Sequence, residues 1–475
     1  MTNAKVKRLF SNLTYAFLSQ CISLLLSLLM SFVVPKFLSV KEFGYWQLFL
    51  FYTSYVGFTH FGLDDGIYLR EGGKRYKDLD FSLIGSQFWL LMFTQAIFAG
   101  VISAFSFFFE KDPNKLFVIL LTGLYMIIFN VFYFLGFIFQ ATNHTKKYSI
   151  SIIIYKLLFI VCIFFLFMSR DIYYKGYVVL YTLTLLISLL YCMAVGRRIV
   201  FAPLMKLSTV LLEAGRNIVV GINLLIANMA GLLIIGSGRL VVEQRWGIES
   251  FGKFSFSISI CNFFLMFVGQ TSMVLFPALR QTNFDNIKKV YVTLHELLDI
   301  VLSGMLLFYF PISYILGFWL PQYKESLKYM SILLPLCTFD GKMQMLCNTY
   351  LQVLRKERWL LFINVASFLI SLLLALLGAY ILCSIQAVVV FMVVAVAFRS
   401  IVSELYTAKL MESEIKKEIA WECFFAISFI VLSLLVPTVA SFLIYLTFYI
   451  AYLVLHKNKV GNIVGMFKRH VLSKG

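Results

Sequence analysis

Charged side chains stand inside long apolar stretches of this 475-residue sequence, where an unpaired charge is costly. Lys156 stands in SIIIYKLLFI, and both Asp340 and Lys342 stand in LCTFDGKMQM. A charge at the centre of a membrane helix costs about 2.5–3.5 kcal/mol on insertion scales, so such residues face water or a partner of opposite charge. Lysines at this depth therefore predict either a hydrated cavity for an anionic group or ion pairs between helices.

Asp340 and Lys342 cannot neutralise each other. Two positions apart on a helix, they point about 200° away from one another. Each needs another partner or water, and both interpretations of Lys342 stay open. Lys156 has no acid in its own stretch, which favours the cavity. Asp340, together with Glu296 and Asp299 in the stretch 290–319, could carry a coupling proton or sodium ion.

The motifs of enzyme chemistry are missing from the sequence. Gly247 to Lys253 fits GxxxxGK, but Phe254 stands where a P-loop needs Ser or Thr for magnesium. The eight cysteines form no CxxC pair, which argues against a zinc site or a disulfide framework. No HExxH motif or nucleophile elbow is present either. We therefore predict no catalytic residue, no metal site and no enzyme.

Fourteen apolar stretches position the charged residues. The chain is 61% hydrophobic and 13% charged, and a bilayer core about 30 Å thick needs about 20 residues per helix. The sequence predicts an all-α polytopic membrane protein. Its spans are expected at about 13–34, 44–64, 82–108, 116–140, 148–168, 175–195, 217–238, 254–279, 290–319, 326–352, 359–381, 384–406, 419–436 and 439–455.

Lysine and arginine fall mainly on alternate loops between these stretches. This pattern follows the positive-inside rule and predicts cytoplasmic N- and C-termini. It also accounts for the net charge of +18 without a nucleic-acid partner.

The two halves of the chain repeat weakly. KEFGYWQLF at the second span is echoed by ESFGKFSFS at the eighth, six spans later. An even number of spans preserves orientation, so the repeat predicts two parallel six-helix bundles. We expect bundles at 1–200 and 201–410, followed at 411–475 by two more helices and a basic cytoplasmic tail.

Three segments carry a resemblance to a known family. VVPKFLSVKEFGYWQLF, GSGRLVVEQRWGIESFGKFSFSISI and LPQYKESLKYMSILLP are similar to the Wzx-type polysaccharide, or O-antigen, flippases of the multidrug/oligosaccharidyl-lipid/polysaccharide (MOP) superfamily. The resemblance covers most of residues 1–420 and implies a MATE-like transporter fold. Many relatives have an acidic residue where this chain has Gly238, so Arg239 is carried over only as a residue of the cavity rim.

The resemblance implies a multi-pass flippase of the bacterial plasma (inner) membrane. Its cargo would be an undecaprenyl-pyrophosphate-linked oligosaccharide for polysaccharide or lipopolysaccharide synthesis, moved to the outer leaflet by alternating access. Partners would be the bilayer, the lipid-linked glycan and a polysaccharide polymerase with its assembly machinery. Lys156, Lys342 and Arg239 would hold the pyrophosphate. No cofactor is expected other than a coupling H+ or Na+.

Two alternatives belong to other functional classes. A cation-coupled multidrug exporter of the same superfamily would favour an acidic cavity, whereas Lys156 and Lys342 favour anionic cargo. A membrane glycosyltransferase or polysaccharide polymerase would need a large outer loop, and no predicted outer loop is long.

Overall fold

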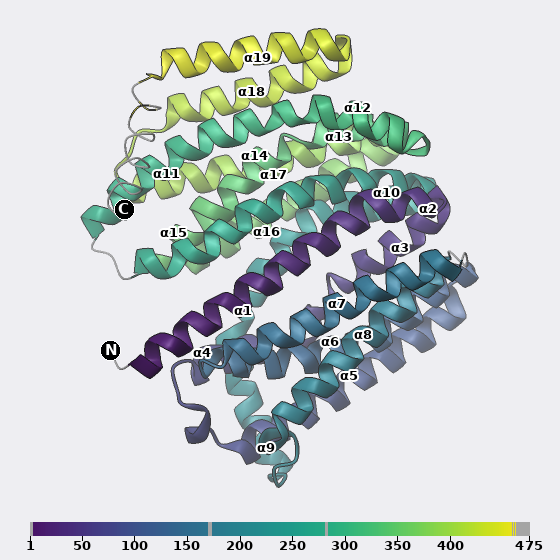
Figure 1. The fold of residues 1–475 in the computed structure, drawn as a ribbon, viewed down its shortest axis with the longest axis vertical. Helices are drawn as coiled ribbons and strands as arrows, with labels where there is room; N and C mark the ends of the chain where they lie inside the picture. The colour runs from purple at the N-terminus through teal and green to yellow at the C-terminus, as the bar shows by residue number, and fades with distance from the viewer. Residues whose placement is uncertain (1–2, 170–172, 281–283, 458, 460, 462–475) are drawn as a thin grey trace. The chain divides into compact units, whose positions relative to one another are not determined.

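The computed structural model describes residues 3–169, 173–280, 284–457, 459 and 461, and these residues form helices and connecting turns without strands (Figure 1). Eleven helices in this part of the chain are long and apolar enough to cross a membrane. One of them, α10 (Leu207–Arg280), holds two predicted spans, and two other predicted spans are divided into shorter helices. The prediction of an all-α polytopic membrane protein is confirmed. In the described residues eleven helices qualify as spans, whereas the sequence predicts fourteen.

Contacts divide the chain into two compact units, Met1–Met229 and Ala230–Gly475. The predicted limits near 200 and 410 stay predictions, and residues 462–475 of the predicted basic tail lie outside the described residues.

The first unit contains twelve helical segments and the beginning of α10. They are α1 (Asn3–Leu28), η1 (Leu29–Val33), α2 (Val34–Phe37), α3 (Val40–Thr53), η2 (Val56–His60), α4 (Leu63–Glu71), η3 (Tyr76–Asp78), α5 (Phe81–Phe109), α6 (Pro113–Ala141), α7 (Thr145–Ser169), α8 (Tyr174–Val195) and α9 (Arg197–Val200).

The second unit contains the rest of α10 and the remaining segments. They are α11 (Phe284–Met305), η4 (Leu306–Phe308), α12 (Tyr309–Trp319), η5 (Pro321–Tyr323), α13 (Lys324–Leu333), α14 (Leu336–Lys342), η6 (Met343–Asn348), α15 (Thr349–Val353), α16 (Glu357–Leu376), η7 (Leu377–Ile381), α17 (Ile385–Leu410), α18 (Lys416–Leu435) and α19 (Thr438–Leu455). Within this unit α18 and α19 lie side by side (Figure 1).

The connection between the seventh and eighth spans differs from the prediction. The sequence predicts a loop over about 239–253, but the helix continues through it and is broken only at Gly247 (φ 80°, ψ −175°). A backbone with this φ suits glycine, which has no Cβ to clash. Helix-forming residues on both sides of Gly247 extend α10 beyond its apolar parts.

Glycines let two helices of the first unit touch through their backbones. A Cβ on Gly66 of α4 would lie 1.9 Å from the carbonyl oxygen of Asn217 in α10. A Cβ on Gly221 of α10 would lie 2.1 Å from the carbonyl oxygen of Gly62. Small residues at such crossings bring helices together by van der Waals packing, which matters in lipid because burial from water provides no driving force there.

Aspartates begin two long helices of the first unit. The side chain of Asp80 accepts from the backbone N–H of Leu83, and that of Asp112 accepts from the N–H of Asn114. Such caps satisfy N–H groups that have no partner inside the helix. Asp112 also accepts a hydrogen bond from the Tyr45 hydroxyl, which ties α3 to the start of α6.

Candidate functional site

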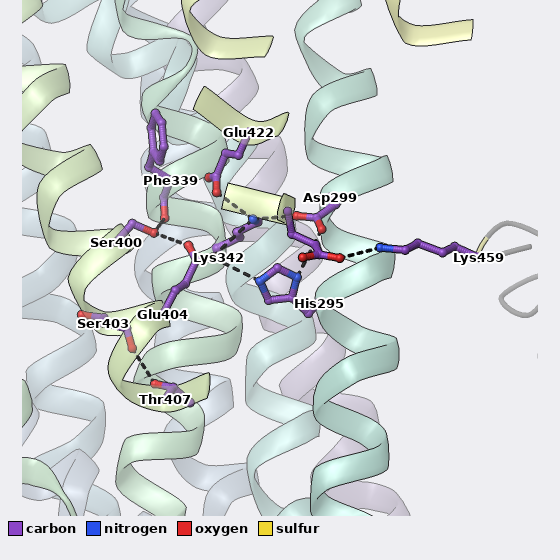
Figure 2. A network of polar contacts seen from close by, with 11 residues as sticks. His295, Asp299, Phe339, Lys342, Ser400, Ser403, Glu404, Thr407, Glu422 and Lys459 are labelled. Carbon is purple, nitrogen blue, oxygen red and sulfur yellow. Dashed lines mark hydrogen bonds and ion pairs between the residues drawn. The ribbon is translucent and has the colours of Figure 1, made fainter. Parts of the chain in front are cut away.

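Lys342 lies at the centre of a buried network of charged side chains in the second unit (Figure 2). Its Nζ lies 2.6 Å from Oδ1 of Asp299, 2.7 Å from Oε2 of Glu422 and 3.4 Å from Oε2 of Glu404. The Lys342 side chain is only 1% exposed. One ammonium group therefore faces three carboxylates.

His295 connects two of these carboxylates from the other side. Its Nδ1 lies 3.2 Å from Oδ2 of Asp299, and its Nε2 lies 3.2 Å from Oε2 of Glu404. The other oxygen of Glu404 accepts a hydrogen bond from the Ser400 hydroxyl at 2.9 Å. We call His295, Asp299, Lys342, Glu404 and Glu422 the charge cluster.

Four helices supply the charge cluster. His295 and Asp299 are four residues apart on α11 and share one of its faces, while Lys342, Glu404 and Glu422 come from α14, α17 and α18. Pro335 stands where the span predicted at 326–352 is divided, since α13 ends at Leu333 and α14 begins at Leu336. A π-helical turn, η6, follows Lys342 directly. Such turns are frequent at functional sites.

Apolar side chains enclose the charge cluster. Packed around it are buried residues of α11, η6 and α15, namely Tyr291, Leu294, Leu298, Leu302, Met345, Leu346 and Tyr350. This packing keeps water away, so each charge depends on its protein partners.

The predicted divergence of Asp340 and Lys342 is confirmed. Asp340 forms an ion pair with Arg399 of α17 and accepts a hydrogen bond of 2.7 Å from Gln344. Lys342 takes Asp299, Glu404 and Glu422 instead. Between the two interpretations of Lys342, this conformation shows ion pairing, and a role at a pyrophosphate stays a prediction.

The other predicted acids separate into two environments. Asp299 belongs to the charge cluster, whereas Glu296 lies 3.8 Å from Nζ of Lys459, which also contacts Glu418 at 2.8 Å. The three acids predicted to couple an ion are thus not gathered at one point. Their role in coupling stays a prediction.

Lys156 lies in the first unit, on α7. Its Nζ donates a hydrogen bond of 2.6 Å to the hydroxyl of Ser23 on α1. Among the residues that the structure describes, no carboxylate forms an ion pair with it. Lys156 is half-buried, so its charge is withdrawn from bulk water without an acid to balance it.

Tyrosine rings gather next to Lys156, which the sequence analysis did not anticipate. The ring centroid of Tyr181 lies 5.2 Å from that of Tyr155 and 5.7 Å from that of Tyr125. Tyr155 precedes Lys156 in α7. The sequence did carry a signal: seven tyrosines lie in the three apolar stretches 116–140, 148–168 and 175–195, and a buried phenol usually has a hydrogen-bond partner.

Arg239 lies on α10, within the second unit. Its Nη2 donates a hydrogen bond of 3.1 Å to Ser255, and its guanidinium lies 5.2 Å from the ring centroid of Phe251. These contacts join the helix before Gly247 to the helix after it. A Cβ on the neighbouring Gly238 would lie 2.9 Å from Sδ of Met392, so close packing on α17 explains a glycine there. The position of Arg239 at a cavity rim stays a prediction.

Of the charge cluster, Asp299 and Lys342 were named as candidate residues from the sequence, but His295, Glu404 and Glu422 were not. Glu422 stands near the start of the span predicted at 419–436, where an acid is ordinarily interfacial. The sequence pointed to it only indirectly: Lys342 has no partner on its own helix, so an acid from another helix could neutralise it.

The family comparison adds a match over more than half of the chain. Residues 9–283 match the model of a family described as polysaccharide biosynthesis protein. No curated protein sequence matches this chain.

Solved structures establish the fold. The lipid II flippase MurJ in an inward closed conformation is 11% identical, with a TM-score of 0.66 over 97% of this chain and 99% of that one. An inward-facing multidrug resistance MATE family transporter of the MOP superfamily is 12% identical, with a TM-score of 0.60 over 85% and 98%. A MOP superfamily transporter from Pyrococcus furiosus is 12% identical, with a TM-score of 0.53 over 86% and 96%. The predicted MATE-like transporter fold is confirmed.

Proposed function

The chain belongs to the polysaccharide biosynthesis protein family, and from this premise we propose that it is a lipid-linked oligosaccharide flippase. It carries an undecaprenyl-pyrophosphate-linked oligosaccharide from the inner to the outer leaflet of a bacterial plasma membrane. Its N- and C-termini lie on the cytoplasmic side, as the distribution of lysine and arginine indicates.

Lys156 is the observation that carries this proposal. It places a positive charge inside an apolar helix, and its hydrogen bond goes to an uncharged hydroxyl. An ammonium group donates three hydrogen bonds, and it binds phosphate oxygens more strongly than neutral acceptors. A pyrophosphate supplies the missing negative charge, whereas a cationic drug would be repelled.

The cargo explains why a protein is needed. The hydroxyls of the sugar would lose their hydrogen bonds to water in hydrocarbon, at a cost of several kcal/mol each. The pyrophosphate carries roughly two negative charges, and an inside-negative potential drives each one outward by about 2.3 kcal/mol per 100 mV. The potential therefore favours export by about 4–5 kcal/mol per 100 mV.

A furrow in the second unit supports a lipid-linked cargo. It has a volume of about 770 Å³ and is lined almost entirely by apolar side chains of α10, α11 and η6 with Tyr449 of α19. Val301 and Phe308 at its edge are more than half exposed, so hydrocarbon can reach it. Such a surface fits a prenyl chain.

The experiment is a transport assay with the purified full chain in liposomes. An undecaprenyl-pyrophosphate oligosaccharide is placed in both leaflets, and an added glycosidase reports how much of it reaches the outer surface. We expect translocation that depends on the protein. The free oligosaccharide and a lipophilic cation serve as comparison cargoes. Transport of the cation alone would contradict the proposal and support the multidrug exporter.

A further inference from the structure

The two ring nitrogens of His295 both face carboxylate oxygens. Nδ1 lies 3.2 Å from Asp299, and Nε2 lies 3.2 Å from Glu404. A neutral imidazole has one N–H donor and one acceptor nitrogen. An acceptor nitrogen can face a carboxyl oxygen only if that oxygen carries a proton. The arrangement Asp299–His295–Glu404 therefore holds one proton more than a neutral histidine between two carboxylates.

The net charge of the charge cluster indicates a second proton, in addition to the one held between His295, Asp299 and Glu404. The charge cluster contains one lysine and three acids, and all of its members are nearly inaccessible (Lys342 1%, Glu404 0%, Glu422 5%). With every acid ionised and His295 neutral, the net charge is −2. The proton on His295 reduces this to −1. An uncompensated buried charge is strongly unfavourable, and such groups neutralise instead.

Glu422 offers the place for that proton. One of its oxygens, Oε2, accepts from Lys342 at 2.7 Å. The other, Oε1, is buried and has no hydrogen-bond partner among the described residues. Glu422 thus contacts Lys342 through one oxygen only, as Figure 2 shows, and its other oxygen is available to carry a proton.

Other ionisable groups around the charge cluster do not neutralise its remaining negative charge. Asp340 and Arg399 neutralise each other. Glu296 and Glu418 share Lys459 and add one further negative charge, which favours proton uptake. The remaining groups are phenols and thiols, which are uncharged in neutral water: Tyr291 of α11, Cys347 of η6, Cys423 of α18 and Tyr452 of α19.

We propose that the charge cluster is a proton-binding site in which Oε1 of Glu422 carries an exchangeable proton. The proton comes from water and returns to water, and no other bond forms or breaks. Its release turns a neutral carboxyl of α18 into an anion beside Lys342 of α14, which draws these two helices together. If the protein is the flippase proposed above, the charge cluster is the site at which a proton gradient would act on transport.

Infrared spectroscopy of the full chain in lipid nanodiscs tests the proposal without any cargo. The carbonyl band of protonated carboxyl groups should weaken as the pH is raised and recover when the pH is lowered again. Glu422→Gln should abolish the pH-dependent part of this band. Glu325→Gln is the matched control, because Glu325 lies in the same unit, away from the cluster, and contacts Lys253 at 2.7 Å. The control should keep the full change.

Three infrared results would overturn the proposal. One is a wild-type band that does not respond to pH. The second is an unchanged response in Glu422→Gln. The third is a band that responds to Na+ at constant pH but not to pH itself, which would assign the cluster to a metal cation.

A second measurement needs no folded variant of Glu422. In wild-type protein labelled with ¹⁵N-histidine, nuclear magnetic resonance counts the N–H groups of each imidazole. We expect two N–H groups on one buried histidine. His295 then holds the first proton, and the pH-dependent carboxyl band belongs to a second proton on a carboxyl group of the charge cluster. A neutral His295 with no protonated carboxyl group would overturn the proposal. Because neither method involves transport, failure of the proton site is distinguishable from failure of the flippase function.

Discussion

The ammonium of Lys156 lies 2.6 Å from the hydroxyl of Ser23, which in turn donates to the backbone carbonyl of Ser19 at 2.7 Å. This chain of hydrogen bonds joins α7 to α1 in the first unit. It ends at a backbone carbonyl, and among the described residues no acid forms an ion pair with Lys156. Under the proposed function, the ammonium group is therefore available to an anionic cargo.

Replacement of Lys156 by methionine should reduce transport of the lipid pyrophosphate about ten- to 100-fold. Hydrogen bonds to charged groups contribute about 1.5–3 kcal/mol, and 1.4 kcal/mol corresponds to a factor of ten. Lys156→Arg should retain most of the activity. The measurement is initial rate in the liposome assay at equal protein density. Lys175→Met is the control, because Lys175 lies at the start of α8 over the ring of Phe117. Equal rates for Lys156→Met and the control would remove Lys156 from the site.

Replacement of Lys342 by methionine should lower the free energy of unfolding by about 3–5 kcal/mol, since it leaves buried carboxylates without their cation. At a pH high enough for Glu422 to have released its proton, adding Glu422→Gln to this variant should recover part of the loss, because one uncompensated acid is then removed. Denaturant titration in detergent measures both. Lys328→Met is the matched control on exposed α13 surface and should stay near wild type. A double variant less stable than Lys342→Met would argue against charge compensation.

Alanine substitutions of two glycines near the crossing of α4 and α10 should have opposite effects on stability. Gly66→Ala should destabilise the protein by about 1–3 kcal/mol, because its Cβ would overlap the Asn217 carbonyl and force the helices apart. A Cβ on Gly215, two residues before Asn217 on α10, would meet no atom within 4 Å, so Gly215→Ala is the comparison. It should be neutral or stabilise by up to about 1 kcal/mol through helix propensity. Thermal unfolding of the two variants in the same detergent compares them directly, and equal effects would contradict the close crossing.

Two capping aspartates should differ in their contribution and in its dependence on pH. Asp112→Ala should cost more stability than Asp80→Ala, whose loss is that of a cap, about 1 kcal/mol. The reason is the additional hydrogen bond from Tyr45. Partial burial alone would raise the pKa of Asp112. The hydrogen bonds from Tyr45 and from the Asn114 N–H lower the pKa by more than burial raises it, so the pKa lies below its usual value.

A carboxyl with a lowered pKa in the folded state stabilises the protein above its unfolded pKa of about 3.9. This contribution is lost as the pH falls through the folded pKa. The stability difference between wild type and Asp112→Ala should therefore shrink on acidification. Unfolding temperatures measured across the acidic range check this, and a difference that grows at low pH would contradict it.

Hydropathy and helix geometry predicted much of this molecule. The all-α membrane fold follows from the length of the apolar segments against the thickness of the bilayer. The different partners of Asp340 and Lys342 follow from their angular separation on one helix. Each of these inferences needs only residues that are near one another in the sequence.

The charge cluster could not be predicted in the same way. Glu422 and Lys342 are 80 positions apart, and His295 and Glu404 are 109 apart. Their contacts depend on which faces of α11, α14, α17 and α18 meet, and the apolar pattern of each helix alone does not say which helix becomes its neighbour. The helix around Gly247 was missed for a different reason, because a polar segment between two spans was interpreted as a loop.

The contact between Glu422 and Lys342 constrains how the protein is made. The ribosome synthesises the chain from its N-terminus, and Glu422 follows Lys342 by 80 residues. Lys342 can therefore enter the bilayer before Glu422 has been synthesised. Until α18 is inserted, only Asp299 of α11, and later Glu404 of α17, can neutralise the ammonium group within the charge cluster. The partners of Lys342 are therefore complete only when α18 has been inserted. A nascent chain that stalls before residue 416 would keep Lys342 in the membrane without Glu422.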